Sequence, residues 1–496
     1  MARGQDNSAP KNTAPQNTAA GGPGARDLTR GPILKTLLFF SLPTLVGNIL
    51  QSLNGSINTI WVGRMLGDSA LAATANANVV TFLVFAAVFG FGMAATVKVG
   101  QAFGAGRTDA ARRTFGTALG FCVGLSAVVS VAGWLGAPAL LRLMATPADI
   151  FGFAQAYLRV IFVALPAMMI SIMVSMGLRG AGDAKTSLYF MILSVVLDCG
   201  LNPLLIGGFG PVPAMGIAGS ALATAIASYV TMLGLLAYGY WHDLPLRLRR
   251  AELVYLIPHA DELRYILAKG LPMGAQMLIV SSAGIVTLGL VNREGSMVSA
   301  AFGASLQVWT YLQMPAMAIS AALSAMAAQS IGAGLASRLG QITRAGVILN
   351  LAVTGTMTAL LLAFDRPVLV LFLGSTSPAV DIARHIQILA SWSYILFGIT
   401  IMLFGTMRAG GVVMAPLLIL AFAMFPVRLG FYHLAYPALG RDALWLMFPV
   451  GSLVTVALAV LAYARPGWRT RASAIPPTAR LESEAGAECA AEGSPG

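Results

Sequence analysis

One acidic residue of this 496-residue chain lies well inside a long apolar run. Asp198 stands in Met191–Pro203, whereas the other eighteen acidic residues fall in predicted tails, loops or ends of apolar runs. Acidic residues inside a membrane are rare and usually functional, because inserting one costs roughly 2.5–3.5 kcal/mol. Burial away from water favours the neutral carboxyl form, so Asp198 is a candidate proton carrier. The alternative is that it only pairs with a cation or completes a polar network.

Amide side chains form a stripe on the first apolar run. At about 100° per residue, the side chains of Asn48, Gln51, Asn54 and Asn58 cluster within about 120° of the helix surface. A single asparagine more often only bonds a neighbouring helix, but the stripe together with Asp198 favours a hydrated pocket. We expect ion coupling by Asp198, Asn202 and Asn58. We expect substrate binding by Asn48, Gln51, Asn54, Thr224 and Arg428.

Arg428 is the only arginine deep within an apolar run. At an offset of 229 residues, position 198 corresponds to position 427, so Asp198 and Arg428 occupy nearly equivalent places in two halves of the chain. One interpretation is that they face each other across a central cavity. The other is that Arg428 extends outward to the membrane surface.

The chain contains an internal repeat. Paired segments recur at offsets of 228 or 229: Gln101–Gly106 with Gln329–Gly334, Leu42-Pro43 with Leu271-Pro272, Arg64 with Arg293, and Arg179 with Arg408. Long repeats in an apolar chain are typical of secondary transporters, whose halves surround a central site. We expect the two Gly-Ala-Gly segments to end helices rather than to hold phosphate.

The composition indicates a membrane protein. The chain is 57% hydrophobic and 10% charged, with a mean hydropathy of +0.78, whereas soluble domains carry about 25% charged residues. A span needs about 20 apolar residues. Twelve runs qualify: 34–62, 70–98, 114–138, 152–176, 186–208, 216–240, 264–292, 297–328, 342–364, 386–407, 412–436 and 443–464. The predicted fold is an all-α integral membrane protein of two six-helix lobes around a central cavity.

The basic residues predict the orientation. Of the 31 Lys and Arg residues, 23 fall on one predicted side and seven on the other, with Arg428 inside a run. Both termini are therefore expected in the cytoplasm, and the net charge of +12 needs no nucleic acid partner. The expected parts are a disordered cytoplasmic tail (1–32), an N-terminal lobe (33–240), a cytoplasmic linker (241–262), a C-terminal lobe (263–465) and a second disordered tail (466–496). A short interfacial helix is expected in the linker.

Catalytic, metal and cofactor chemistry find no support in the sequence. The three cysteines are scattered, none of the four histidines has metal-site spacing to another, and no G-x-x-x-x-G-K-[ST] motif is present. No nucleophile–base arrangement stands out. We expect a monomer in the bilayer that moves small organic molecules, not an enzyme, and without a cofactor.

The motifs resemble the multidrug and toxic compound extrusion (MATE) family over roughly residues 33–465. The resemblance rests on their order across both halves: Leu42-Pro43, Val62-Gly63-Arg64-x-x-Gly67, the Gln101 motif, Leu178 to Asp183, Asn202-Pro203, Gly216 to Thr224, Leu271-Pro272, the Gln329 motif, Arg408 and Arg428. It implies a twelve-helix antiporter in the bacterial inner membrane. Such antiporters expel bulky, often cationic or amphipathic compounds in exchange for protons or sodium ions.

The chain departs from the family pattern at several acidic positions. Asn58 replaces an acid of the first span, and Val280 and Phe397 stand where some members carry acids. The remaining acid, Asp198, lies in the N-terminal half, as in the DNA-damage-inducible branch, although the usual order of Asn and Asp is reversed. One carboxylate favours protons over Na⁺, which prefers several oxygen ligands. Sodium-coupled export, flipping of a lipid-linked saccharide and a regulatory scaffold remain alternatives.

Overall fold

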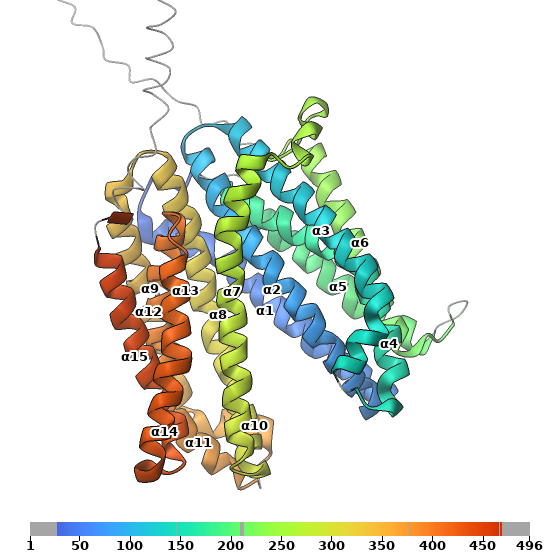
Figure 1. Ribbon diagram of the computed structural model, residues 1–496, viewed down its shortest axis with the longest axis vertical. Coiled ribbons are helices and arrows are strands. Elements are labelled where there is room, and N and C mark those ends of the chain that lie inside the picture. Colours follow the sequence, from blue (N-terminus) through green and yellow to red (C-terminus); the bar gives the residue numbers. More distant parts are fainter. Residues whose placement is uncertain (1–26, 145, 209–212, 376, 466, 469–496) are drawn as a thin grey trace, which may run out of the picture.

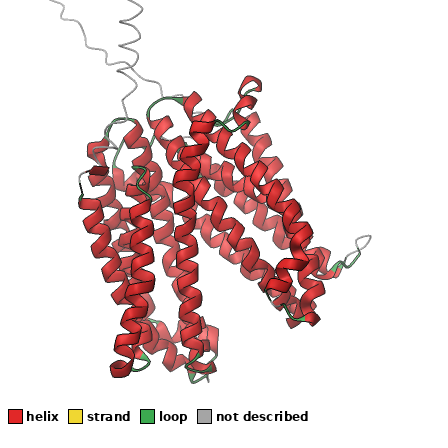
Figure 2. Cartoon of the chain, in the orientation of Figure 1, coloured by secondary structure: helices red, strands yellow, loops and turns green. Residues whose placement is uncertain are grey.

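The computed structural model describes residues 27–144, 146–208, 213–375, 377–465 and 467–468. Within these ranges the chain folds into helices and loops, without a strand (Figure 2). Residues 1–26 and 469–496, which make up most of the two predicted tails, lie outside the described residues.

Six long helices form the N-lobe. Each is apolar around most of its circumference, as expected where lipid or protein surrounds a helix whose backbone groups bond internally. They correspond one to one to the first six predicted spans. The helices are α1 (Ile33–Leu66), α2 (Asp68–Gly104), α3 (Thr108–Leu143), α4 (Ala148–Gly180), α5 (Lys185–Gly207) and α6 (Gly216–Trp241).

The C-lobe repeats this plan with more interruptions. Its helices are α7 (Ala260–Asn292), α8 (Ser296–Gly332), α9 (Leu339–Ala363), α10 (Asp365–Leu373), α11 (Ala379–Ala390), α12 (Ser393–Ala409), α13 (Met414–Phe422), α14 (Arg428–Leu439) and α15 (Asp442–Ala464). Short 3₁₀ helices cover Arg250–Leu256 (η1) and Ala336–Arg338 (η2), and a π-helix (η3) covers Ala423–Val427.

The predicted number of spans is confirmed for the described residues. By length and composition, eleven helical stretches there can cross a membrane, and the pair α11 and α12, bent by 45°, makes a twelfth. The bend lies where Gln387 and Ser391 both accept a hydrogen bond from the indole of Trp309, at 2.8 and 2.9 Å. The short α10 was not predicted.

The two lobes are close together at one end and apart at the other (Figure 1). They pack crosswise: α1 of the N-lobe contacts α8, and α7 of the C-lobe contacts α2. The first helix of each repeat therefore packs against the second helix of the other repeat. We call the end at which α2, α4, α8 and α12 terminate the closed end.

A repeated glutamine joins the lobes at the closed end. The Gln101 amide donates to the main-chain oxygen of Ala409 in the C-lobe, at 2.7 Å. The Gln329 amide donates to the main-chain oxygen of Gly180 in the N-lobe, at 3.0 Å. Because Gln101 corresponds to Gln329 and Gly180 to Ala409 in the repeat, the two hydrogen bonds are equivalent by internal symmetry. We call Gln101 and Gln329 the glutamine pair.

The glycines of the same motif have two separate tasks. Gly106 and Gly334 adopt φ of +71° and +74° just after α2 and α8, which confirms that the motif ends these helices. Gly104 and Gly332 lie against the backbone of the opposite glutamine, where a Cβ atom would overlap a carbonyl oxygen. The glycines therefore permit the close approach that the glutamine pair requires.

Residues 27–32, which composition assigned to the first tail, contact the C-lobe. Leu28 is fully buried, and its N–H donates to the Gln329 side chain at 3.1 Å. The Arg338 guanidinium donates to the main-chain oxygen of Gly31 at 2.7 Å. The packed part of the chain thus begins before the predicted lobe boundary at residue 33, because one leucine in a polar segment finds an apolar site between the lobes.

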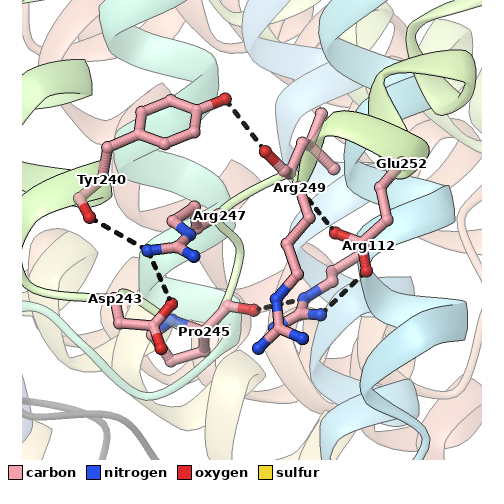
Figure 3. Close-up of polar contacts among 8 residues, drawn as sticks. Arg112, Tyr240, Asp243, Pro245, Arg247, Arg249 and Glu252 are labelled. Carbon is pink, nitrogen blue, oxygen red and sulfur yellow. Dashed lines mark hydrogen bonds and ion pairs between the residues drawn. The ribbon is translucent and has the colours of Figure 1, made fainter.

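The linker between the lobes is fixed to α3 (Figure 3). Arg112 of α3 donates to the main-chain oxygen of Pro245 at 3.1 Å and to the Glu252 carboxylate at 2.9 Å. Glu252 also accepts the N–H of Arg249 at 2.7 Å. The predicted short helix is present as η1, with Leu253 and Ile257 exposed, and this anchoring determines its position.

Glu262 ties the start of α7 to the N-lobe. Its buried carboxylate accepts the Lys98 ammonium of α2 at 2.7 Å and the Thr114 hydroxyl of α3 at 2.9 Å. Crosswise packing of α7 is therefore supported by a charged contact as well as by apolar surface.

Candidate functional site

Three N-lobe helices bring the residues predicted for ion coupling close to two of those predicted for substrate binding. Asn54 and Asn58 lie on α1, Asp198 and Asn202 on α5, and Thr224 on α6. These helices contact one another pairwise, and Asp198 and Asn202 are 3% and 1% exposed. The structure thus assembles a polar cluster from segments that are far apart in the sequence.

The Asp198 carboxylate is surrounded by donors. The Asn54 amide donates to Oδ2 at 2.8 Å, and the Thr224 hydroxyl donates to Oδ1 at 2.9 Å. The Asn202 amide donates to Oδ1 at 3.3 Å and to the Asp198 main-chain oxygen at 3.0 Å. An ionised carboxylate only accepts hydrogen bonds, so this arrangement matches the charged form. Protonation would make one oxygen a donor and would weaken the hydrogen bonds that the carboxyl group accepts, because its negative charge is lost.

The neighbouring shell contains residues that sequence reasoning missed. Ser220 donates to the Asn58 side-chain oxygen at 2.8 Å, and the buried Tyr157 lies beside Asn58. Cys199 contacts the Asn54 side-chain oxygen at 3.5 Å, which fixes the Asn54 amide with its nitrogen toward Asp198. Ser220 lies one turn before Thr224 on the same face of α6, a spacing that was visible in the sequence.

Asn58 itself is joined to Ser220 rather than to Asp198. Asn48 is half-buried and Gln51 is exposed, and neither side chain bonds to any described residue. The amide stripe is therefore divided: its middle contacts the carboxylate, and its other members do not. Substrate binding by Asn48 and Gln51 stays a prediction.

An open acceptor remains inside the cluster. Asn202 Oδ1 is buried without a hydrogen-bond partner in the described part of the chain. Such a group is satisfied by a donor that enters the site. Across the described ranges no three His, Cys, Asp or Glu side chains gather as metal ligands. The side chains that bond to Asp198 are two neutral amides and a hydroxyl.

Arg428 lies at a different place, in the C-lobe. It is the first residue of α14 and borders a cavity of about 430 Å³ between α7, α8, α12 and α15. Val280 and Phe397, which stand where some members of the family that the sequence resembles carry acids, line the same cavity. No ion pair joins Arg428 to Asp198 among the described residues, so in this conformation the two groups do not pair across the lobes. We call this space the C-lobe cavity.

The fold and these two sites define a class of protein. A chain with two parallel helical repeats, an acidic residue buried in one lobe and a cavity in the other has the architecture of a secondary transporter. The sequence model of the MatE family matches residues 43–204 and 272–432, which are the two repeats. The chain belongs to the MatE family of membrane transporters, which are not enzymes.

Relatives support this placement across most of the chain. "Probable multidrug resistance protein YoeA" of Bacillus subtilis (strain 168) is 34% identical over 441 residues, which cover 88% of this chain and 95% of that protein. A protein named "FAD transporter" from Shewanella oneidensis (strain MR-1) is 28% identical over 357 residues, covering 71% and 77%. The homologues thus include multidrug efflux transporters of the MATE family.

A solved structure confirms the fold. The "Outward-facing conformation of a multidrug resistance MATE family transporter of the MOP superfamily" superimposes with a TM-score of 0.81, at 22% identity, over 92% of this chain and 99% of that one. The predicted fold class, a multi-pass helical membrane protein of two repeats, is therefore confirmed.

Proposed function

We propose that this protein is a proton-coupled antiporter that exports bulky, amphipathic organic compounds across the bacterial inner membrane. The observation that carries the proposal is the buried Asp198 carboxylate, held by donors from α1, α5 and α6. The alternative coupling ion, Na⁺, prefers several hard oxygen ligands, and Asp198 is the only carboxylate in the cluster. In this proposal the protein works as a monomer and uses no cofactor.

Protonation of Asp198 is the proposed coupling step. The ionised carboxylate accepts from Asn54, Asn202 and Thr224, and cationic cargo competes with the proton for the same negative charge. A proton that arrives from outside neutralises the charge and weakens the hydrogen bonds from these donors, which alters the contacts among the three helices. Each ligand shifts the balance between conformations only by its different affinity for them, so proton and cargo must act on the same carboxylate.

The proposed orientation places the closed end and both termini in the cytoplasm. The conformation in Figure 1 is then open toward the outside, with the glutamine pair holding the cytoplasmic ends of the lobes together. Opening toward the cytoplasm requires both hydrogen bonds to break. The lobes then exchange cargo on one side and protons on the other.

The test uses purified protein in liposomes with a fluorescent organic cation. A proton gradient and a sodium gradient are imposed separately on the wild type, Asp198→Asn and Asp149→Asn. Asp149 is exposed at the start of α4, so its variant controls for loss of one acid in the same lobe. We expect proton-driven uptake in the wild type and the control, and its loss in Asp198→Asn. Full proton-driven uptake by Asp198→Asn would refute the proposed coupling residue.

The same experiment weighs the alternatives. Uptake driven by sodium alone would identify a sodium-coupled exporter. Absence of uptake under either gradient would favour a flippase of a lipid-linked saccharide or a regulatory scaffold. The relatives are named as multidrug resistance proteins and as a FAD transporter. These names do not point to one cargo charge, so each site has to be considered separately.

A further inference from the structure

Arg428 is a cation without a counter-charge inside a membrane span. Within the described residues it forms no ion pair and no hydrogen bond, and its Nε atom is buried without a partner. Its guanidinium carbon lies 4.9 Å from the centre of the Phe448 ring. Charged groups in this position are costly and normally paired, so an unopposed Arg428 indicates that its partner comes from outside the chain.

The C-lobe cavity can hold such a partner. Its volume of about 430 Å³ falls within the range of about 300–1,000 Å³ that is typical of small-molecule sites. Aromatic side chains of Phe302, Phe397 and Phe448 line it, and no acidic residue does. Gln313 and Tyr394 also line it, and their side chains make no hydrogen bond to a described residue. The polar groups of Arg428, Gln313 and Tyr394 therefore border a space that is lined mainly by apolar side chains, with a few serine and threonine hydroxyls.

Local backbone features position Arg428 in the cavity. The π-helix Ala423–Val427, with Pro426, directly precedes it, and such π segments are frequent at functional sites. On α15, Gly451 lies beside the arginine, where a Cβ atom would come within 2.7 Å of Arg428 Cγ and Nε. A glycine at this position leaves the room that the arginine side chain occupies.

We propose that the C-lobe cavity is an anion-binding subsite, which takes the carboxylate, sulfonate or phosphate group of an organic anion with an aromatic body. Guanidinium binds such groups through paired, charge-assisted hydrogen bonds. The Gln313 amide and the Tyr394 hydroxyl supply further donors, and the phenylalanine rings contact the body of the ligand. This subsite deepens the proposed transport function, because it adds anionic or zwitterionic compounds to the cargo, and it rests on that function for their passage.

The test is equilibrium binding to the full chain in nanodiscs of zwitterionic lipid, without any ion gradient. The probes are 1-pyrenesulfonate and 1-pyrenemethylammonium, which share one ring system and carry opposite charges. We expect Arg428→Met to weaken sulfonate binding at least tenfold and to leave ammonium binding unchanged. Arg428→Lys, which keeps the charge but cannot form the paired hydrogen bonds, is expected to show a sulfonate affinity between those of the wild type and Arg428→Met. Equal sulfonate affinity in the wild type and Arg428→Met would overturn the proposal, provided that both elute as monodisperse protein.

Two further arms separate the sources of the anion and the two proposals. Replacing part of the lipid by phosphatidylglycerol tests whether a lipid phosphate occupies the site: lost sulfonate binding supports the subsite with lipid as its ligand, and retained binding supports a soluble anion. Asp198→Asn is expected to leave sulfonate binding unchanged while proton-driven uptake of the cation is lost. Failure of the anion subsite and failure of the coupling proposal therefore give different results.

Discussion

Asp198 is stabilised in its ionised form by side chains that can be removed one at a time. Thr224→Val keeps the shape of the threonine but deletes the donor to Asp198 Oδ1. Loss of a hydrogen bond to a charged group is worth about 1.5–3 kcal/mol. One pH unit corresponds to about 1.4 kcal/mol, so we expect the pH at half-maximal transport to rise by about one to two units. Proton-driven uptake across a pH series measures this change.

Thr231→Val is the matched control for this change. Thr231 lies on the same helix, and its buried hydroxyl has no partner among the described residues. Its replacement removes the same atom without a contact to Asp198. An equal displacement of the pH profile by both variants would contradict a direct role for Thr224.

At the residue scale, the sequence predicted the carboxylate but only part of its surroundings. A single acid in an apolar run identified Asp198, and helical spacing identified Asn202. The amide stripe extends from Asn48 to Asn58, about 15 Å of helix at 1.5 Å per residue. The Asp198 carboxylate can contact only about one turn of this neighbouring helix. Which turn contacts α5 depends on the height at which the helices cross, and this is a property of packing that the stripe does not contain.

At the scale of elements, Glu262 carries the charged contact between α7 and the N-lobe. Glu262→Gln leaves Lys98 without its counter-charge and weakens the bond to Thr114. We expect a loss of about 1–3 kcal/mol of stability, seen as a lower melting temperature of the purified protein. Asp261→Asn, at the exposed neighbouring position, is expected to change stability by less than about 0.5 kcal/mol. Equal effects would show that the contact contributes only general surface charge.

The anchoring of the linker is expected to depend on acidity. Burial raises the pKa of Glu252, but the Arg249 N–H and the Arg112 guanidinium outweigh it and hold the pKa below its usual range. A depressed pKa means that the stabilisation is fully present above the unfolded-state pKa of about 4.3 and is lost as the pH falls through the lower folded value. Amide protection factors around η1, which compare each exchange rate with the intrinsic rate at the same pH, should therefore be constant from pH 7 to pH 5 and fall only below about pH 4. Early loss of protection near pH 6 would contradict this.

Breaks within helices were the least predictable elements. The run 386–407 reads as one span, yet the chain bends between α11 and α12 where Gln387 and Ser391 bond to Trp309 of α8. The π-helix before Arg428 likewise lies where η3 and α14 pack against α15. Hydropathy reports where a span lies, but a bend is decided by a partner on another helix.

At the scale of the whole molecule, the glutamine pair controls the closed end. Gln101→Ala removes one cross-lobe hydrogen bond, and Gln329→Ala removes one and also the contact to Leu28. Each neutral hydrogen bond is worth about 0.5–1.5 kcal/mol, so we expect the cytoplasm-open population to grow about two- to tenfold, more for Gln329→Ala.

The cytoplasm-open population can be measured by double electron–electron resonance between spin labels at Lys185 and Ser337. Both residues are exposed, and they lie on opposite lobes near the closed end. The labels are placed in a variant without native cysteines. Gln341→Ala, an exposed glutamine of α9, serves as the control. An unchanged distance distribution in both single variants would show that apolar packing alone holds this end closed.

The repeat predicted two lobes and their parallel relation, because duplicated motifs at one offset require duplicated folds. It did not predict the crosswise packing of α1 and α7 or the contact of residues 27–32 with the C-lobe. Such contacts join segments that are distant in sequence, and they are selected by shape and backbone proximity rather than by residue type.

The glutamine pair has the form of an isologous interface, in which each partner offers the other the same surface. Gln101 contacts Ala409, and Gln329 contacts Gly180, so a twofold homodimer of one repeat would carry this contact without any change. Joining two such copies in one chain makes their association independent of concentration. It also releases each copy from the other's sequence, so that one half can carry an acid, Asp198, while the other carries a base, Arg428, one residue after the position equivalent to 198.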